Sequence, residues 1–151
     1  MNEVKILEGE IELDYKWNPG PTVGRFLTNL RDHKELTAVR CNVSSKVFLP
    51  PQGWSPYVNR KMDKFLTIVT NPKLKFGTIV YKAPWNAPEG VELPYMLAAL
   101  SFIGADTELL HIVVAPEEKL KALKEGDELA PVWKETRTGT IRDILYFVPK
   151  G

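Results

Sequence analysis

The 151-residue sequence contains one cysteine, Cys41, and two histidines, His33 and His111. A single cysteine cannot form a disulfide within the chain, which fits a reducing compartment, and we expect a cytoplasmic protein. A structural zinc site needs four ligands, so these three residues cannot hold zinc by themselves. The GxxxxGK[ST], GxGxxG, GxSxG and HExxH motifs are also missing, which leaves no nucleotide-binding, hydrolase or metalloprotease signature.

Long hydrophobic runs are missing as well. The longest nearly uncharged stretch, 93–105, is too short to cross a bilayer and is interrupted by Pro94 and Gly104. The N-terminus starts acidic, so we expect no signal peptide and no membrane partner. The balance of 44% hydrophobic and 26% charged residues is typical of a globular domain with a core of its own.

Acidic residues are nearly absent from the middle of the chain. From Arg40 to Lys82 there are eight basic residues and one acid, Asp63, which gives this stretch a net charge of +7 and leaves −6 on the rest. Such a stretch favours an anionic partner, such as phosphate groups, nucleic acid or an acidic protein face. A solvated charged face is an equally good interpretation.

The pattern divides the chain into an acidic segment with an amphipathic helix (1–38), a loop-rich finger (39–62) and a β-rich region (63–151). Apolar residues at helical spacing after a turn at 18–21 predict a helix near 22–35. Its apolar stripe is buried either by its own domain or by a partner subunit. Prolines and a glycine exclude a helix from 47–57.

The β-rich region predicts five strands and one short helix. The first strand is bent at Asn71-Pro72, and the helix begins at Pro116, between the third and fourth strands. One helix in that position is the layout of an OB-fold barrel. The strands are expected at 65–70 with 74–81, 94–103, 108–114, 128–135 and 140–148.

The finger resembles a zinc ribbon whose ligands have been replaced. The sequence reads RCNVS at 40–44, VFLPP at 47–51 and SPYV at 55–58. This resembles the RCxxC…PPxxxCPxC pattern of acyl-CoA-associated OB-fold proteins, which carry a rubredoxin-like zinc ribbon before the barrel. On that pattern the ligand positions hold Cys41, Ser44, Ser55 and Val58. Three of these cannot supply a thiolate, so zinc is not expected.

The resemblance gives the fold class as mainly β: a five-stranded OB-fold barrel preceded by an N-terminal helix and a degenerate zinc-ribbon-like finger. Proteins of this family are small partners of thiolase-superfamily enzymes. The resemblance therefore implies a non-catalytic accessory or scaffold subunit of an acyltransferase, thiolase or aldolase complex, which bridges subunits and helps to form the CoA tunnel. It implies a hetero-oligomer with a thiolase-superfamily large subunit, in which the chain alone binds no cofactor and a CoA ester lies at the interface.

Two sets of side chains follow from this interpretation. Large apolar residues and prolines of the first two regions are expected at the partner interface. They are Tyr15, Trp17, Phe26, Leu30, Phe48, Pro50, Pro51 and Trp54. Basic residues are expected to attract the phosphates of CoA. They are Arg60, Lys61, Lys64, Lys73 and Lys75.

Catalysis by the chain itself has little support. Cys41 with His33 or His111 is the one conceivable nucleophile–base pair, and a leftover small residue beside a barrel-wall or core histidine is the better interpretation. We therefore assign no catalytic residue. The alternative function is an OB-fold protein that binds single-stranded nucleic acid, because aromatic residues such as Trp54 and Tyr57 lie among the lysines. A pI of about 7.8 is low for such a protein.

Overall fold

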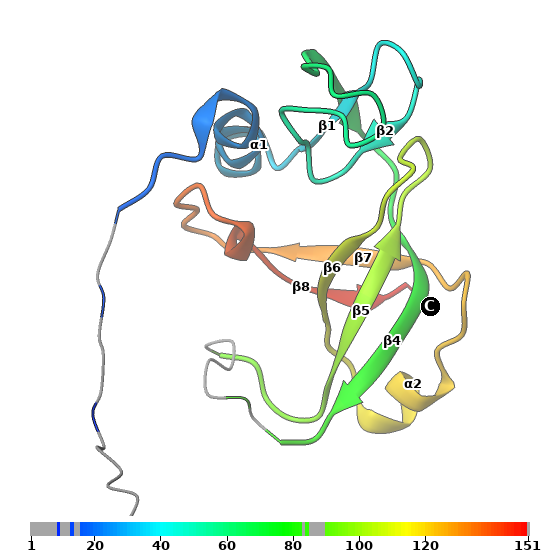
Figure 1. Ribbon diagram of the computed structural model, residues 1–151. Helices are drawn as coiled ribbons and strands as arrows, with labels where there is room; N and C mark the ends of the chain where they lie inside the picture. Colours follow the sequence, from blue (N-terminus) through cyan, green and yellow to red (C-terminus); the bar gives the residue numbers. More distant parts are fainter. Residues whose placement is uncertain (1–8, 10–12, 14–15, 83, 85–89, 151) are drawn as a thin grey trace, which may run out of the picture.

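The computed structural model describes residues 9, 13, 16–82, 84 and 90–150. Its elements are α1 (Gly20–His33), β1 (Leu36–Arg40), β2 (Val47–Phe48), β3 (Lys64–Ile68), β4 (Lys73–Val80), β5 (Tyr95–Ser101), β6 (Leu109–Val113), α2 (Glu117–Ala122), β7 (Leu129–Trp133), a 3-10 helix η1 (Ile141–Asp143) and β8 (Ile144–Pro149). The strands form a three-stranded sheet of order β2-β1-β3 and a five-stranded sheet of order β4-β5-β6-β8-β7. Figure 1 shows α1 and β1 together at one end of the molecule and the five-stranded sheet at the other. The predicted mainly β fold is confirmed.

The α1 helix starts two residues before the predicted position and ends two residues earlier. Pro21 lies in its first turn, where the missing N–H has no helical partner to lose. Lys34 ends the helix in the left-handed conformation, with a φ of 57°. Phe26 and Leu30, about one turn apart, form its buried face. Neither α1 nor any other helix in the described ranges has the length and apolarity needed to cross a membrane.

The five-stranded sheet has the strand order and the helix position expected of an OB-fold. β5 pairs antiparallel with β4 on one side and β6 on the other. β6 then pairs in parallel with β8 through Val113 and Phe147. α2 and β7 lie between these two strands in the chain and form the crossover connection that a parallel pair needs. β7 completes the sheet as the antiparallel partner of β8.

The two edge strands of this sheet meet at one end. Lys73 of β4 forms a β-bridge with Glu128, next to β7. The Leu74 N–H donates a hydrogen bond of 2.8 Å to the Asp127 carbonyl, beside that bridge. The sheet therefore curls until its edges touch there, which leaves few unpaired backbone groups at that end.

Two strands differ from the sequence-based prediction. The stretch 65–70 was expected in the barrel, but β3 pairs along its whole length with β1 in the three-stranded sheet. The buried Pro72 has no N–H to continue the ladder, so the chain leaves one sheet before it and enters the other after it. The last predicted strand, 140–148, begins with η1. The buried Asp143 carboxylate holds this turn by accepting the N–H groups of Thr138, Gly139 and Thr140.

One hydrophobic core joins the helix, the finger and the five-stranded sheet. Its buried residues include Leu30 of α1, Ala38 of β1, Leu100 of β5 and Phe147 of β8. A second, smaller cluster lies inside the finger and consists of Val39, Cys41, Phe48 and Met62. The three regions predicted from the sequence therefore all contribute to one core.

Candidate functional site

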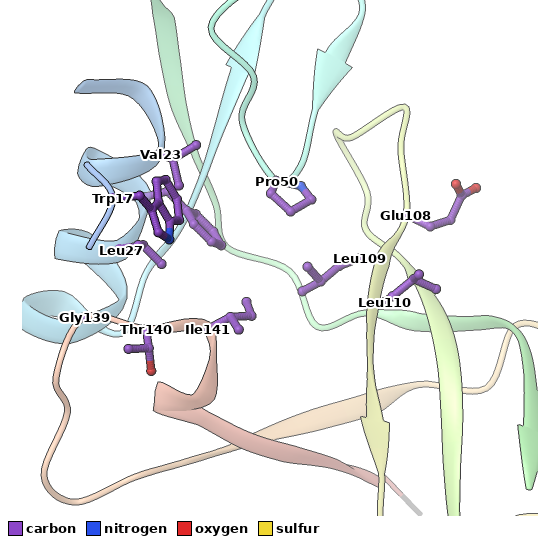
Figure 2. Close-up of a pocket in the computed structure, with 11 residues that line it drawn as sticks. Trp17, Val23, Leu27, Pro50, Glu108, Leu109, Leu110, Gly139, Thr140 and Ile141 are labelled. Atoms are coloured by element: carbon purple, nitrogen blue, oxygen red, sulfur yellow. The ribbon is translucent and has the colours of Figure 1, made fainter. Parts of the chain in front are cut away.

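An apolar groove lies where α1, the finger loop and the five-stranded sheet meet. We call it the helix–barrel groove, and its volume is about 610 Å³. Figure 2 shows the lining residues, which come from α1 and Trp17 just before it, from the finger loop at Pro50, from the start of β6 and from the loop that leads into η1. The lining residues are Trp17, Val23, Phe26, Leu27, Pro50, Glu108, Leu109, Leu110, Gly139, Thr140 and Ile141. Glu108 is the one ionisable side chain among them, so the groove suits an apolar chain or side chain.

Hydrogen bonds fix the walls of the groove relative to one another. The Leu49 N–H, next to Pro50, donates to the Thr107 hydroxyl at 2.8 Å, which ties the finger loop to the start of β6. Arg137 Nε donates to the Arg31 carbonyl at 2.6 Å, which ties the loop after β7 to the last turn of α1. These two hydrogen bonds, both made outside the groove, tie its neighbouring walls together.

The predicted partner-binding residues fall into two groups. Trp17 and Trp54 are 67% and 60% exposed, and Pro50 lines the helix–barrel groove. Tyr15 lies outside the described residues. The other four are buried by this chain: Phe26, Leu30, Phe48 and Pro51.

This burial corrects one prediction of the sequence. The apolar stripe of α1 was open to burial by its own domain or by a partner subunit, and Phe26 and Leu30 were expected at the partner interface. They are 2% and 0% exposed within the chain's own core. The reason is that β1 and η1 both pack against α1 and the helix joins the common core, a coverage that a local apolar pattern cannot reveal. A partner can reach Trp17 and Pro50 without any rearrangement of the fold.

The four positions that align with zinc ligands lie together inside the finger. The Ser44 N–H donates to Cys41 Sγ at 3.4 Å. Hydrogen bonds from the Ser44 and Ser55 side chains lower the pKa of Cys41 to about 6, against an opposing effect of burial. Val58 packs on the cluster that contains Cys41. One thiol, two hydroxyls and an alkyl group do not make a zinc site, so the residues present do not fit the metal.

The two loops that carry these positions have matching backbone geometry. The Ser45 N–H donates to the Cys41 carbonyl at 3.0 Å, and the Asn59 N–H donates to the Ser55 carbonyl at 3.1 Å. Ser45 and Asn59 both adopt the left-handed conformation, with φ values of 60° and 45°. Each loop therefore makes the same tight turn, one after Cys41 and the other after Ser55.

The predicted anion-binding residues are spread over both sheets, and all five are exposed. Lys75 of β4 pairs with Glu125, and Lys73 lies beside Glu128. Arg60 and Lys61 lie in the finger, and Lys64 opens β3. The structure therefore does not place them all in one site.

Lys64 instead shares a groove with two arginines that the sequence analysis did not select. We call it the basic groove; its volume is about 590 Å³. It is lined by Arg25, Arg40, Asp63, Lys64, Phe65 and Leu66. The pairing of β1 with β3 brings Arg40 to Lys64, and the packing of α1 brings Arg25 to Phe65. No local sequence pattern predicts that Arg40 lies next to Lys64 or that Arg25 lies next to Phe65.

The histidine of the barrel wall has a structural environment. His111 is 9% exposed and packs edge-on against Phe147, with ring centroids 5.3 Å apart. Burial is the main cause that lowers its pKa, and its Nδ1 accepts the N–H of Ile112 at 2.9 Å. The interpretation as a buried wall histidine is confirmed. Among the described residues, no three His, Cys, Asp or Glu side chains gather as a metal site would require.

Comparisons with known proteins identify the fold. No family model matches the sequence, and no curated protein matches it. A crystal structure of a DUF35-family protein of unknown function from Sulfolobus solfataricus is similar, with a TM-score of 0.59, 17% identity, and coverage of 75% of this chain and 78% of that chain. The structure described as the Ltp2–ChsH2(DUF35) aldolase is also similar, with a TM-score of 0.58, 19% identity, and coverage of 83% and 93%. The chain thus has the fold of DUF35 proteins.

Proposed function

We propose that this chain is a non-catalytic accessory subunit of a thiolase-type acyl-CoA enzyme complex. The observation that carries the proposal is the shared fold over 93% of the similar chain in the Ltp2–ChsH2(DUF35) aldolase, whose name joins a DUF35 component to a second one. The four positions that the resemblance aligns with zinc ligands add support, because they gather in the finger, as the ligands of a zinc ribbon would. In this complex the chain bridges subunits and helps to form the wall of the CoA tunnel.

Exposed apolar side chains around the helix–barrel groove provide the docking surface. Trp17 and Leu110 on its rim are 67% and 65% exposed. On the outer face of the sheet, Ala99 lies between Phe76 and Leu110 in register, and Phe76 is 66% exposed. Contiguous apolar surface of this kind marks sites of protein association. The occupant we assign is the thiolase-superfamily large subunit.

The groove itself suits the arm of a CoA ester. Its lining is mostly aliphatic and aromatic, and the hydrogen bonds of Leu49 and Arg137 hold its walls in place. Once a large subunit covers the open side, the groove becomes a channel that excludes water from a pantetheine or acyl chain. The catalytic cysteine and histidine belong to the large subunit in this proposal.

The side chains described here are poorly placed to carry the reaction. Cys41 is 1% exposed and surrounded by serines, and His111 is packed against Phe147 in the barrel wall. A nucleophile and its base must lie within hydrogen-bond reach of each other and of substrate. Cys41 belongs to the finger cluster and His111 to the five-stranded sheet, so the two side chains lie in different parts of the fold.

The test is co-purification of the tagged full-length chain from its native cells, with Leu110→Glu as the interface variant. A charge at this exposed position removes the partner while the fold persists. Val69→Glu is the matched control, because Val69 is 88% exposed and does not line the groove. We expect a stoichiometric thiolase-superfamily protein with the parent chain and the control, and its loss with Leu110→Glu. Recovery of the chain without such a protein contradicts the proposal.

The alternative, binding of single-stranded nucleic acid, finds one supporting feature in the structure. Phe76 on β4 and Tyr81 directly after it are exposed, and Lys73 and Lys75 lie on the same strand, which resembles a stacking surface. Acidic groups neutralise it, however: Lys75 pairs with Glu125, and the Tyr81 hydroxyl donates to Glu117. Tight and steeply salt-dependent binding of an oligonucleotide would favour this alternative.

A further inference from the structure

We propose that the basic groove binds a phosphate monoester, held by Arg25, Arg40 and Lys64. This inference concerns a different surface from the helix–barrel groove and does not depend on the accessory role. It starts from the pairing of two cations. Arg40 of β1 and Lys64 of β3 are directly opposite each other in the antiparallel register, an arrangement in which like charges destabilise a sheet.

A third cation joins this pair from another element. Arg25 lies in the first half of α1, and its guanidinium carbon lies 4.5 Å from the centre of the Phe65 ring. Phe65 follows Lys64 in β3, so the ring holds the Arg25 side chain over the same strand. A cation–π contact of this kind orients the guanidinium before any ligand arrives, which lowers the entropy lost on binding.

None of the three cations forms an ion pair in the part of the chain that the structure describes, although the charge of Arg40 also acts on Asp106. Arg31, Lys46, Lys75, Lys121 and Lys150 each form an ion pair there, whereas Arg25, Arg40 and Lys64 do not. Asp63 is the one acid that lines the groove, and its carboxylate accepts a hydrogen bond from the Asn42 amide at 3.4 Å. Unpaired basic side chains thus gather where they repel one another.

The charge and shape of the groove indicate the class of ligand. Three cations and one carboxylate leave a formal charge of +2, which matches a phosphate monoester, because that group carries about −1.5 to −2 at neutral pH. The guanidinium forks of Arg25 and Arg40 suit the geometry of phosphate oxygens. A volume of about 590 Å³ leaves room for the organic part of the ester beside Leu66.

Titrations of the full-length chain at constant ionic strength test the assignment. The probes are inorganic phosphate, glycerol 3-phosphate and adenosine 3′-monophosphate, with sulfate and a single-stranded oligonucleotide for comparison. Binding is followed by calorimetry and by amide NMR shifts. We expect the two esters to bind and to shift the amides of Arg40, Lys64 and Phe65. The stronger of the two identifies the source of the group as a polar metabolite or a nucleotide.

The variants Arg40→Gln and Lys64→Gln each remove one of the opposed cations. We expect at least a tenfold loss of ester affinity together with a rise in Tm, because the repulsion across β1 and β3 is relieved. Lys119→Gln is the matched control: Lys119 is exposed on α2 and does not line the groove, so it should keep the parent affinity.

Each of the following results would overturn the proposal. The first is equal loss of affinity in Lys119→Gln and Lys64→Gln, which would indicate a diffuse electrostatic effect. The second is binding of sulfate or inorganic phosphate as strong as that of either ester, or no binding at all. The third is an oligonucleotide that binds more tightly than the esters and displaces them.

Discussion

The Cys41 thiol lies buried in the finger, where hydrogen bonds from the Ser44 and Ser55 side chains stabilise its ionised form. They lower its pKa from the ordinary value of 9.0 to about 6. The consequence is a link between pH and stability. Between these two values the unfolded thiol is protonated while the folded one is ionised, so the unfolded chain binds more protons and the free energy of unfolding rises with pH.

The first prediction is therefore a pH-dependent contribution of Cys41 to stability. It is fully present above pH 9 and is lost as the pH falls toward about 6. Urea unfolding at a series of pH values should show a steeper rise in stability for the parent chain than for Cys41→Ala. The substitution also leaves a small cavity, which lowers stability at every pH, so the difference in slope is the readout. Parallel curves would contradict the pKa assignment.

Single positions differ in how far the sequence could predict them. The resemblance of the finger to a zinc ribbon predicted that Cys41, Ser44 and Ser55 belong to one site, and they do lie together. Arg25 was not selected, because its partner Phe65 is brought to it by the packing of α1 on the rest of the fold. No local pattern reports such a contact.

Among the elements, β4 depends on a glycine at its centre. A Cβ added to Gly77 would lie 2.8 Å from Met96 Cγ and 3.1 Å from the Leu97 carbonyl oxygen on the neighbouring strand. We predict that Gly77→Ala lowers the free energy of unfolding by about 1–3 kcal/mol, the usual cost of overpacking. Gly24→Ala is the matched control, since the nearest atom there is 3.9 Å away and the position is helical.

Gly24→Ala should raise the free energy of unfolding by about 0.5–1 kcal/mol, because alanine restricts the unfolded chain and favours the helix. Both variants are measured by urea unfolding. If Gly77→Ala were as stable as the parent chain, β4 and β5 would not approach each other as closely as described.

The finger makes a second prediction at this scale. Its two loops have the same turn geometry after Cys41 and Ser55. Ser44 and Val58 hold the other two positions that the resemblance aligns with zinc ligands. The triple variant Ser44→Cys, Ser55→Cys, Val58→Cys should therefore bind one equivalent of zinc, with four thiolates at tetrahedral positions. Metal analysis and the cobalt absorption spectrum measure this directly.

The same three substitutions in a Cys41→Ala background are the control for the zinc experiment. With three thiolates the site should bind zinc more weakly than with four. A quadruple-cysteine finger that binds no metal would show that the four positions do not converge as the structure places them.

The elements also show where sequence analysis stops. Local signals identified α1, α2 and the strands of the five-stranded sheet, since turns and apolar periodicity act over a few residues. The partner of β3 could not be inferred. Pairing between β1 and β3 joins residues far apart in the chain. Asn71-Pro72 predicted a bend in one strand, whereas the division of that stretch between two sheets was not predicted.

For the whole molecule, the helix–barrel groove matters more than the stripe of α1. Phe26 and Leu30 help to hold the helix on the core, while Trp17 and Leu110 remain exposed on the groove. From the sequence, the large apolar residues of the first region could be predicted to stabilise the fold or to bind a partner. It could not separate those that stabilise the fold from those left on its surface, because that division depends on which elements pack together.

The central claim is that this chain works as one part of a hetero-oligomer, and the mass of the native particle tests it most directly. We would purify the full-length chain from its own cells under gentle conditions and measure intact particles by native mass spectrometry. The account predicts a complex of the 17.1-kDa chain with a thiolase-superfamily subunit in a fixed ratio. A lone 17.1-kDa species, or a particle that contains nucleic acid, would contradict it.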